Sequence, residues 1–180
     1  MKDPEDILWV TRVLLLNDQQ AYSSLMNKYL PHIQRYFIIQ TKGNQAVSDD
    51  LTQETFIKAW QGLSSFRQIS SFRNWLLKIA FNTFISYMRE NKKEELFESI
   101  DDDIGTYEIM DDEAPRPERE DELHRAIYRL NLKERQCVTL YYLEEKKIKE
   151  IAKITGYPEG SIKAYLSRGR SNLEKILIKE

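Results

Sequence analysis

Apolar residues recur at helical spacing along most of the chain, and no stretch of the first 92 residues alternates apolar and polar positions as a half-buried strand does. Between residues 72 and 88 every fourth position is apolar, with Leu76, Ala80 and Phe84 at the centre. Similar stripes run through residues 4–16, 21–37 and 51–63. They predict a four-helix bundle in residues 1–92 and an all-α fold for the chain.

Polar residues and prolines indicate where these helices begin and end. Asp3 followed by Pro4 is typical of a helix start, and residues 48–50 (Ser-Asp-Asp) predict the start of the third helix. Gly62 stands where a helix is expected to stop. Pro31 predicts a kink or a break in the second helix, because proline has no backbone N–H.

A second helical block is expected over residues 118–180. Amphipathic helices are predicted around residues 123–130 and 133–143. Ala152, Gly156 and Ile162 then have the spacing of a helix-turn-helix, in which a small residue, a turn with positive φ and an apolar plug follow one another.

The second helix of this motif combines a buried stripe with a basic outer face. The stripe comprises Ile162, Leu166, Gly169, Leu173 and Leu177. The outer face carries short and basic side chains suited to a major groove, with Tyr165 and Arg170 on its flanks: Ser161, Lys163, Ala164, Ser167, Arg168, Ser171 and Lys175. A helical hairpin with a solvated basic face is the alternative.

The net charge of -2 is an average over segments of opposite sign. Residues 1–92 carry a net charge of +3, residues 93–122 a net charge of -11, and residues 123–180 a net charge of +6. The acidic segment lacks apolar periodicity and contains prolines, so residues 93–117 are predicted to be a flexible linker between two domains.

Composition excludes several classes of protein. A single cysteine, Cys137, excludes an internal disulfide and fits a reducing cytoplasm. Two His and one Cys are too few for a zinc cluster of these ligands, and no cofactor-binding motif is found. The longest apolar run near the N-terminus, residues 13–16, is too short for a signal peptide or membrane insertion.

Two further faces in the first block suggest partners. Lys78, Asn82 and Arg89 share one side of the fourth helix, and Phe66 and Arg67 precede it. Aromatic, amide and cationic groups together are used to hold single-stranded bases, although Phe66 is also a candidate core residue. The third helix combines acidic and polar residues with aromatics, which suits a protein partner or an ordinary solvated surface.

These segments resemble a known family. Residues 50–60, Phe66-Arg67 and residues 72–82 are similar to the second region of the extracytoplasmic-function (ECF) group of bacterial sigma factors. Residues 132–138 and 148–173 resemble their fourth region. The resemblance covers about 150 residues in the right order, and two independent motifs agree.

The resemblance implies a role for each face. Core RNA polymerase would be bound through Asp50, Leu51, Gln53, Glu54, Phe56 and Trp60. The promoter −10 element would be contacted by Phe66, Arg67, Lys78, Asn82, Arg89, Lys92 and Lys93. The −35 element would be contacted by Ser161, Lys163, Ala164, Tyr165, Arg168 and Arg170.

The resemblance also implies where the linker runs, and it shows three positions at which this sequence differs from the usual pattern of the family. In the family the linker enters the polymerase active-site cleft, where an acidic chain would resemble RNA in charge. Ala164 and Tyr165 stand where basic or hydroxyl residues are common, and Phe81 stands where arginine is usual. We therefore expect a modest promoter strength without help from another DNA-bound protein.

The expected function is promoter recognition and melting for a polymerase, not enzymatic catalysis by the chain itself. Partners implied are core polymerase, promoter DNA, and an anti-sigma factor or a recruiting protein. A helix-turn-helix regulator acting without polymerase is the main alternative, although no dimer seam is visible in the sequence. A helical enzyme is a weaker alternative, because no nucleophile, phosphate-loop or metal motif is found.

Overall fold

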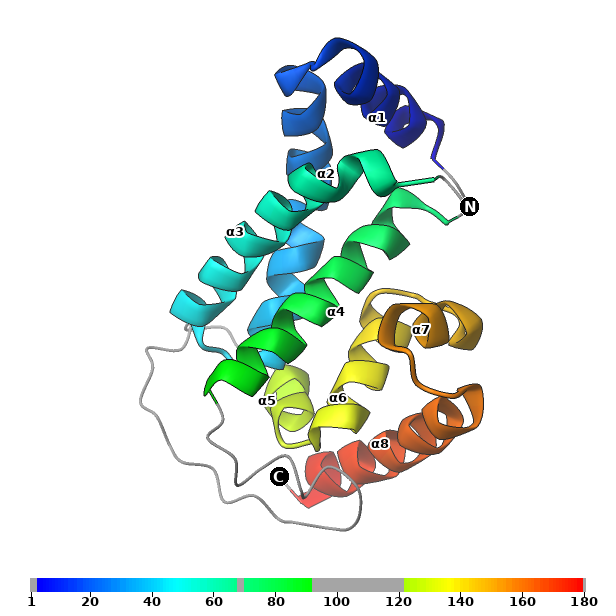
Figure 1. Ribbon diagram of the computed structural model, residues 1–180. Coiled ribbons are helices and arrows are strands. Elements are labelled where there is room, and N and C mark those ends of the chain that lie inside the picture. The colour runs from blue at the N-terminus through cyan, green and yellow to red at the C-terminus, as the bar shows by residue number, and fades with distance from the viewer. Residues whose placement is uncertain (1–2, 68–69, 92–121, 180) are drawn as a thin grey trace.

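The computed structural model describes residues 3–67, 70–91 and 122–179, and every regular element in these ranges is a helix (Figure 1). The predicted all-α fold is therefore confirmed. The first block contains α1 (Pro4–Leu16), α2 (Gln19–Gln40), α3 (Gln45–Gly62), the 3-10 turn η1 (Leu63–Ser65) and α4 (Phe72–Asn91). The second block contains α5 (Glu122–Tyr128), α6 (Leu132–Val138), η3 (Thr139–Leu143), α7 (Ile148–Thr155) and α8 (Glu159–Lys179).

In the first block α2, α3 and α4 pack around large apolar side chains, and α1 lies across one end of α2 (Figure 1). Phe37, Leu76 and Phe84 are buried at their centre, as the apolar stripes predict. Burying a side chain of this size contributes about 1.5–3 kcal/mol to folding.

The first helix begins as predicted and the third does not. Asp3 caps α1 by accepting a hydrogen bond from the Glu5 backbone N–H at 3.0 Å. The prediction that the third helix starts at residues 48–50 is wrong, because Asn44 already caps α3 through the Val47 N–H at 3.1 Å. Ser48 is consequently buried inside α3.

Pro31 does not interrupt α2, so the predicted break is absent: the helix is continuous from Gln19 to Gln40. The ring lies on the exposed side of the helix. The carbonyl of Asn27, which loses its helical partner, belongs to an exposed residue where water can replace the hydrogen bond.

In the second block, the segment expected as one helix over residues 133–143 has two parts. α6 starts one residue earlier, capped by Asn131, and from Thr139 the backbone widens into the π-helical turn η3. Cys137 is fully buried in α6, and burial raises the pKa of its thiol to about 12. The thiol is therefore protonated at neutral pH.

The two blocks pack directly against each other. α7 packs against α4, while α5 and α6 contact α2, so one continuous apolar core reaches from the first block into the second (Figure 1). The sequence did not predict this contact. The expected linker at residues 93–117 lies outside the described residues, and the division into two functional domains stays a prediction.

Candidate functional site

The helix-turn-helix has the expected turn. Gly156 has φ = 78°, and its N–H donates to the Ala152 carbonyl at 2.9 Å, which ends α7. A non-glycine residue is strained at this φ. Ile162 is fully buried between the two helices. Gly156 and Ile162 thus set the direction in which α8 leaves the turn.

Gly169 allows α8 to lie close against α6. A Cβ atom at this position would stand 2.8 Å from Cγ2 of Val138, closer than carbon atoms pack. The absence of a side chain therefore lets the two helices meet, with Leu166 buried one turn earlier. This contact orients the whole length of α8.

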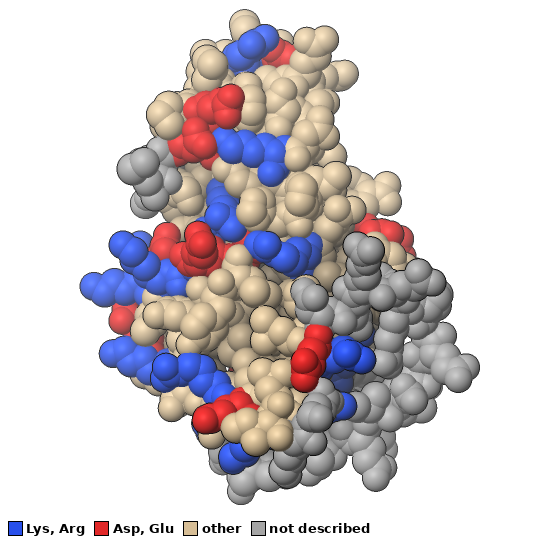
Figure 2. Space-filling view, turned by 180° about the vertical axis from the view of Figure 1, so that it is seen from behind, with Lys and Arg blue, Asp and Glu red and all other residues tan. Residues whose placement is uncertain are grey.

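The opposite side of α8 is open to solvent. Lys163, Ala164, Arg168 and Arg170 are exposed, whereas Ser161 and Tyr165 are half-buried. Figure 2 shows Lys and Arg side chains gathered at the edge of the molecule where α7 and α8 lie. A helix face with small and cationic side chains can enter a major groove and meet base edges and phosphates.

Arg168 is held in place by its neighbours. Its guanidinium stacks 5.3 Å from the centre of the Tyr165 ring, and its Nε lies 3.7 Å from a carboxylate oxygen of Glu134. Glu134 is buried and also accepts a hydrogen bond from Asn172 at 3.0 Å. The sequence did not predict the roles of Glu134 and Asn172, because nothing in the pattern of α6 indicates that Glu134 faces α8, 38 positions away from Asn172.

Arg170 faces a different surface from Arg168. Together with Lys163 it lines a shallow groove of about 190 Å³, whose apolar wall includes Tyr142 and Leu166. Two residues along a helix differ by about 200°, so Arg168 and Arg170 lie on nearly opposite sides of α8.

On α4, Lys78, Asn82 and Arg89 are exposed. Arg67 is exposed as well, whereas Phe66 is only 8% exposed and packs 5.3 Å from Trp75, ring centre to ring centre. The structure thus places Phe66 in the core, the alternative that its sequence left open. The predicted contacts Lys92 and Lys93 lie outside the described residues.

The predicted polymerase face of α3 is part exposed and part buried. Asp50, Gln53 and Glu54 are exposed, while Leu51 and Phe56 are buried. Trp60 keeps 39% of its surface exposed, although its ring packs edge-on against Tyr22 at 4.7 Å. The exposed part is thus an acidic patch next to a partly open indole.

A buried ion cluster joins the two blocks. Glu144, fully buried in the second block, accepts hydrogen bonds from Arg35 and Arg73 of the first block, each at 2.6 Å. Arg73 also donates to Nδ1 of His32 at 3.1 Å. Burial, followed by the charge of Arg73, lowers the pKa of His32, so the ring is neutral at pH 7 and Nδ1 is the acceptor.

Further contacts extend this interface along α4 and α7. Asn74 donates to Glu150 at 2.6 Å, and the ring of Phe81 packs edge-on against Tyr157 with 5.9 Å between centres. Phe81 is 5% exposed. Its apolar character, noted above as a departure near the −10 surface, therefore has a packing role between the blocks.

Among the described residues, no group of three or more His, Cys, Asp or Glu side chains is arranged to hold a metal ion. No helix in the described ranges is long and apolar enough to cross a membrane.

Family comparisons cover both blocks. The Sigma-70 region 2 family model matches residues 25–94, and the Sigma-70, region 4 model matches residues 120–173. RNA polymerase sigma factor YlaC of Bacillus subtilis is 30% identical over 168 residues, which cover 91% of this chain and 96% of that protein. ECF RNA polymerase sigma factor SigM of the same species is 32% identical over 152 residues, covering 82% and 90%.

Solved structures agree with the sequence matches. Sigma factor RpoE from Bartonella quintana, in complex with the anti-sigma factor NepR, matches with a TM-score of 0.67 and 26% identity, covering 87% of this chain and 96% of that one. CnrH, solved with the cytosolic domain of CnrY, has the same fold with a TM-score of 0.67 at 19% identity. The chain belongs to the ECF group of the sigma-70 family of RNA polymerase sigma factors.

Proposed function

We propose that this sigma factor binds bacterial core RNA polymerase in the cytoplasm and directs it to promoters. α8 contacts the −35 element, and α4 with residues 62–71 contacts the −10 element and assists melting. The observation that carries the proposal is the exposed basic face of α8, fixed from behind by Ile162 and Gly169. The polymerase performs the covalent chemistry, and the chain performs none.

The residue roles are those that the family resemblance implies, and the exposure of Lys163, Ala164 and Arg168 supports them. At the −35 element, Lys163, Ala164 and Arg168 face bases, with backbone contacts from Ser161, Tyr165 and Arg170. At the −10 element, Asn82 and Phe66 act on bases, and the nearby cations contact phosphates. The polymerase docks on the acidic, partly aromatic side of α3 described above.

The packed arrangement must open for both elements to be contacted at once. The elements are named for positions about 25 base pairs apart, which corresponds to about 85 Å of duplex. A compact chain of 180 residues has a radius of gyration of about 16 Å and a diameter of about 40 Å. The 25 residues from 93 to 117 reach at most about 90 Å when extended, which is enough to connect the separated blocks.

An anti-sigma factor is the proposed partner of the packed form. RpoE, which matches this chain over both blocks, was solved with an anti-sigma factor bound. At promoters we expect a recruiting protein to help, because Ala164 and Tyr165 offer few hydrogen bonds to DNA. Strong initiation on naked DNA by the chain and core polymerase alone would contradict this expectation.

The test is run-off transcription with core polymerase over a pool of genomic DNA, in which start sites are mapped. Asn82→Ala should reduce promoter melting and leave co-purification with polymerase unchanged. Asn91→Ala, an exposed amide at the end of the same helix, is the matched control. A chain that initiates nowhere and has the native mass of a DNA-binding dimer would favour a conventional regulator instead.

A further inference from the structure

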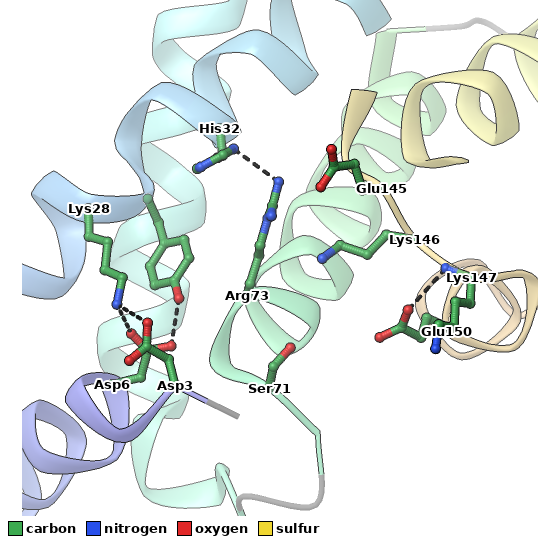
Figure 3. Close-up of a pocket in the computed structure, with 11 residues that line it drawn as sticks. Asp3, Asp6, Lys28, His32, Ser71, Arg73, Glu145, Lys146, Lys147 and Glu150 are labelled. Carbon is green, nitrogen blue, oxygen red and sulfur yellow. Dashed lines mark hydrogen bonds and ion pairs between the residues drawn. The ribbon is translucent and has the colours of Figure 1, made fainter. Parts of the chain in front are cut away.

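The polar pocket between the two blocks, about 450 Å³ in volume, has a balanced set of charges (Figure 3). Four acidic and four basic side chains line it, and Lys28 is bound there by Asp3 and Asp6 at 2.6 and 2.8 Å. These contacts account for the pocket as part of the packed interface. The charged residues around Arg168 differ, because they lie beside the face of α8 proposed to contact DNA.

Glu134 lies behind α8 and contacts two of its side chains, which are one helical turn apart. One carboxylate oxygen accepts a hydrogen bond from Asn172 at 3.0 Å, and the other lies 3.7 Å from Nε of Arg168. The side chain of Glu134 is 3% exposed, whereas that of Arg168 is 61% exposed. A buried carboxylate is costly without a cation nearby, so we expect Nε of Arg168 to stay close to it while the rest of the guanidinium reaches solvent.

Tyr165 supports the same guanidinium from the side. The guanidinium carbon of Arg168 lies 5.3 Å from the centre of the ring, within the range of a cation–π contact. The ring is itself packed edge-on against Tyr157, with 5.9 Å between centres, and the Tyr157 hydroxyl donates to Gln136 at 2.8 Å. The aromatic ring at position 165, noted above as a difference from the family pattern, therefore provides a platform for Arg168.

These two contacts leave one edge of the Arg168 guanidinium open. Its two terminal nitrogens make no hydrogen bond to any part of the chain that the structure describes. With Nε facing Glu134, the terminal nitrogens form the edge that remains for a bidentate contact. This edge matches O6 and N7 of guanine in the major groove, whereas adenine presents an amino group in place of O6.

We propose that Tyr165 and Glu134 are positioning residues, which hold Arg168 in the conformation that reads one guanine of the −35 element. This role rests on the proposed function, in which α8 contacts that element. Ordering a long side chain on binding costs free energy, and an arginine that is already ordered avoids this cost at the correct base. At any other base the bidentate contact is not made, so the gain appears as discrimination between bases.

Promoter binding by the holoenzyme, formed from the full chain and core polymerase, tests these roles. Fluorescence anisotropy gives the dissociation constant for each of the four bases at every −35 position of a promoter mapped as above. Arg168→Ala identifies the position that Arg168 reads. Tyr165→Leu and Glu134→Gln should each lower the preference for guanine there about two- to tenfold, and leave the preferences at the other positions unchanged.

Two control variants separate positioning from other effects. Tyr165→Phe keeps the ring and removes the hydroxyl, so it should retain the preference for guanine. Glu174→Gln removes a carboxylate from an exposed position of α8, which should strengthen binding to any DNA without changing base preference. Equal losses in Tyr165→Phe and Tyr165→Leu would refute the platform, and equal changes of base preference in Glu174→Gln and Glu134→Gln would refute the role of Glu134.

Double variants show whether the two residues act through Arg168. In the Arg168→Ala background, Tyr165→Leu and Glu134→Gln should cause no further change in base preference. A further loss in that background, or equal losses at all −35 positions, would mean that these residues support α8 as a whole, and would overturn the proposal. An Arg168→Ala variant that weakens binding to all four bases equally would also overturn it.

The NMR signal of the Arg168 Nε–H, in the full chain without polymerase or DNA, gives a second readout. Arg168→Ala identifies the signal by its loss. Tyr165→Leu should move the signal, because the ring current of Tyr165 disappears, whereas Tyr165→Phe should move it little. An unchanged signal in Tyr165→Leu would contradict the positioning of Arg168. A chain that forms no holoenzyme would contradict the proposed function instead, and this measurement would still decide whether Arg168 is held in place.

Discussion

The two surfaces proposed to contact DNA differ in how complete they are. On α8 the exposed residues Lys163 and Arg168 stand on a helix locked from behind, so this surface is formed before DNA arrives. In the first block Asn82 is exposed but Phe66 is buried against Trp75. A preformed face suits an intact duplex, whereas a surface with its aromatic in the core becomes complete only after local rearrangement.

In the first block, the helix proposed to contact the −10 element, α4, also packs against the second block. α4 carries the proposed −10 face and also supplies Arg73, Asn74 and Phe81 to the packed interface. The state of the interface is therefore expected to matter more for the −10 surface than for α8. The following predictions test this difference.

Glu144→Gln should have the largest effect. It removes the negative charge between Arg35 and Arg73, and we expect a loss of about 3 kcal/mol in the stability of the packed form. Small-angle scattering should show a larger radius of gyration, and hydrogen exchange should rise on the inner side of α4 while the buried side of α8 stays protected.

Glu145→Gln is the matched control, because it removes the same charge from an exposed position on the same turn. It should leave both measurements unchanged. Equal loosening in both variants, or loss of protection in α8 with Glu144→Gln, would contradict the difference drawn between the two surfaces.

Gly169→Ala should have the next largest effect, confined to the second block. The added Cβ would lie 2.8 Å from Val138, and overpacking of this kind costs about 1–3 kcal/mol in the free energy of unfolding. Gly160→Ala, where no atom lies within 4 Å, should be neutral or stabilising in urea unfolding. A stable Gly169→Ala variant with unchanged −35 binding would show that α8 is not locked from behind as described.

Arg168→Ala should act more on recognition than on folding, because Arg168 is exposed and the Glu134 carboxylate keeps its hydrogen bond from Asn172. If its guanidinium is bidentate to one base, we expect a loss of about 1–3 kcal/mol at that −35 position in promoter-binding assays. Lys175→Ala removes one charge from the same side of the helix and serves as the comparison, because loss of a phosphate contact should weaken specific and scrambled DNA equally. Equal losses of binding free energy on specific and scrambled DNA would indicate that Arg168 contacts a phosphate and not a base.

The smallest effect concerns pH. The lowered pKa of His32 means that the unfolded chain binds a proton near pH 6.5 while the folded ring, beside Arg73, resists it. Stability should therefore fall as the pH drops from 7 toward 5. His32→Asn should flatten this dependence in urea unfolding. An unchanged pH dependence in His32→Asn would show that a different group causes the loss of stability.

Local patterns predicted most of the helices, because their causes are local. The Asp3 cap and the positive φ of Gly156 depend on residues within one turn, and the apolar stripes repeat every three or four positions. The start of α3 was missed because two polar segments, at Asn44 and at residues 48–50, could each cap a helix. Long-range packing, which buries Ser48, decided between them.

The contact between the blocks could not be predicted, because its partners are far apart in sequence. Glu144 lies in a run of charged residues typical of a solvated turn, yet it pairs with Arg35 and Arg73, 109 and 71 positions away. Phe81 was interpreted through the DNA surface for the same reason: its partner, Tyr157, follows the acidic segment. Pairwise contacts of this kind leave no periodic signal.

The division of α8 into a locked side and an open side has an evolutionary consequence. If Lys163 and Ala164 contact promoter bases as proposed, substitutions there should alter promoter choice at little cost in folding free energy, because both side chains are exposed. Substitutions at Gly169 should lower the folding free energy whichever promoter is read, because an added Cβ would stand 2.8 Å from Val138. We therefore expect related chains to diverge in the genes they switch on while keeping the same scaffold, because the two sides of this one helix carry separate constraints.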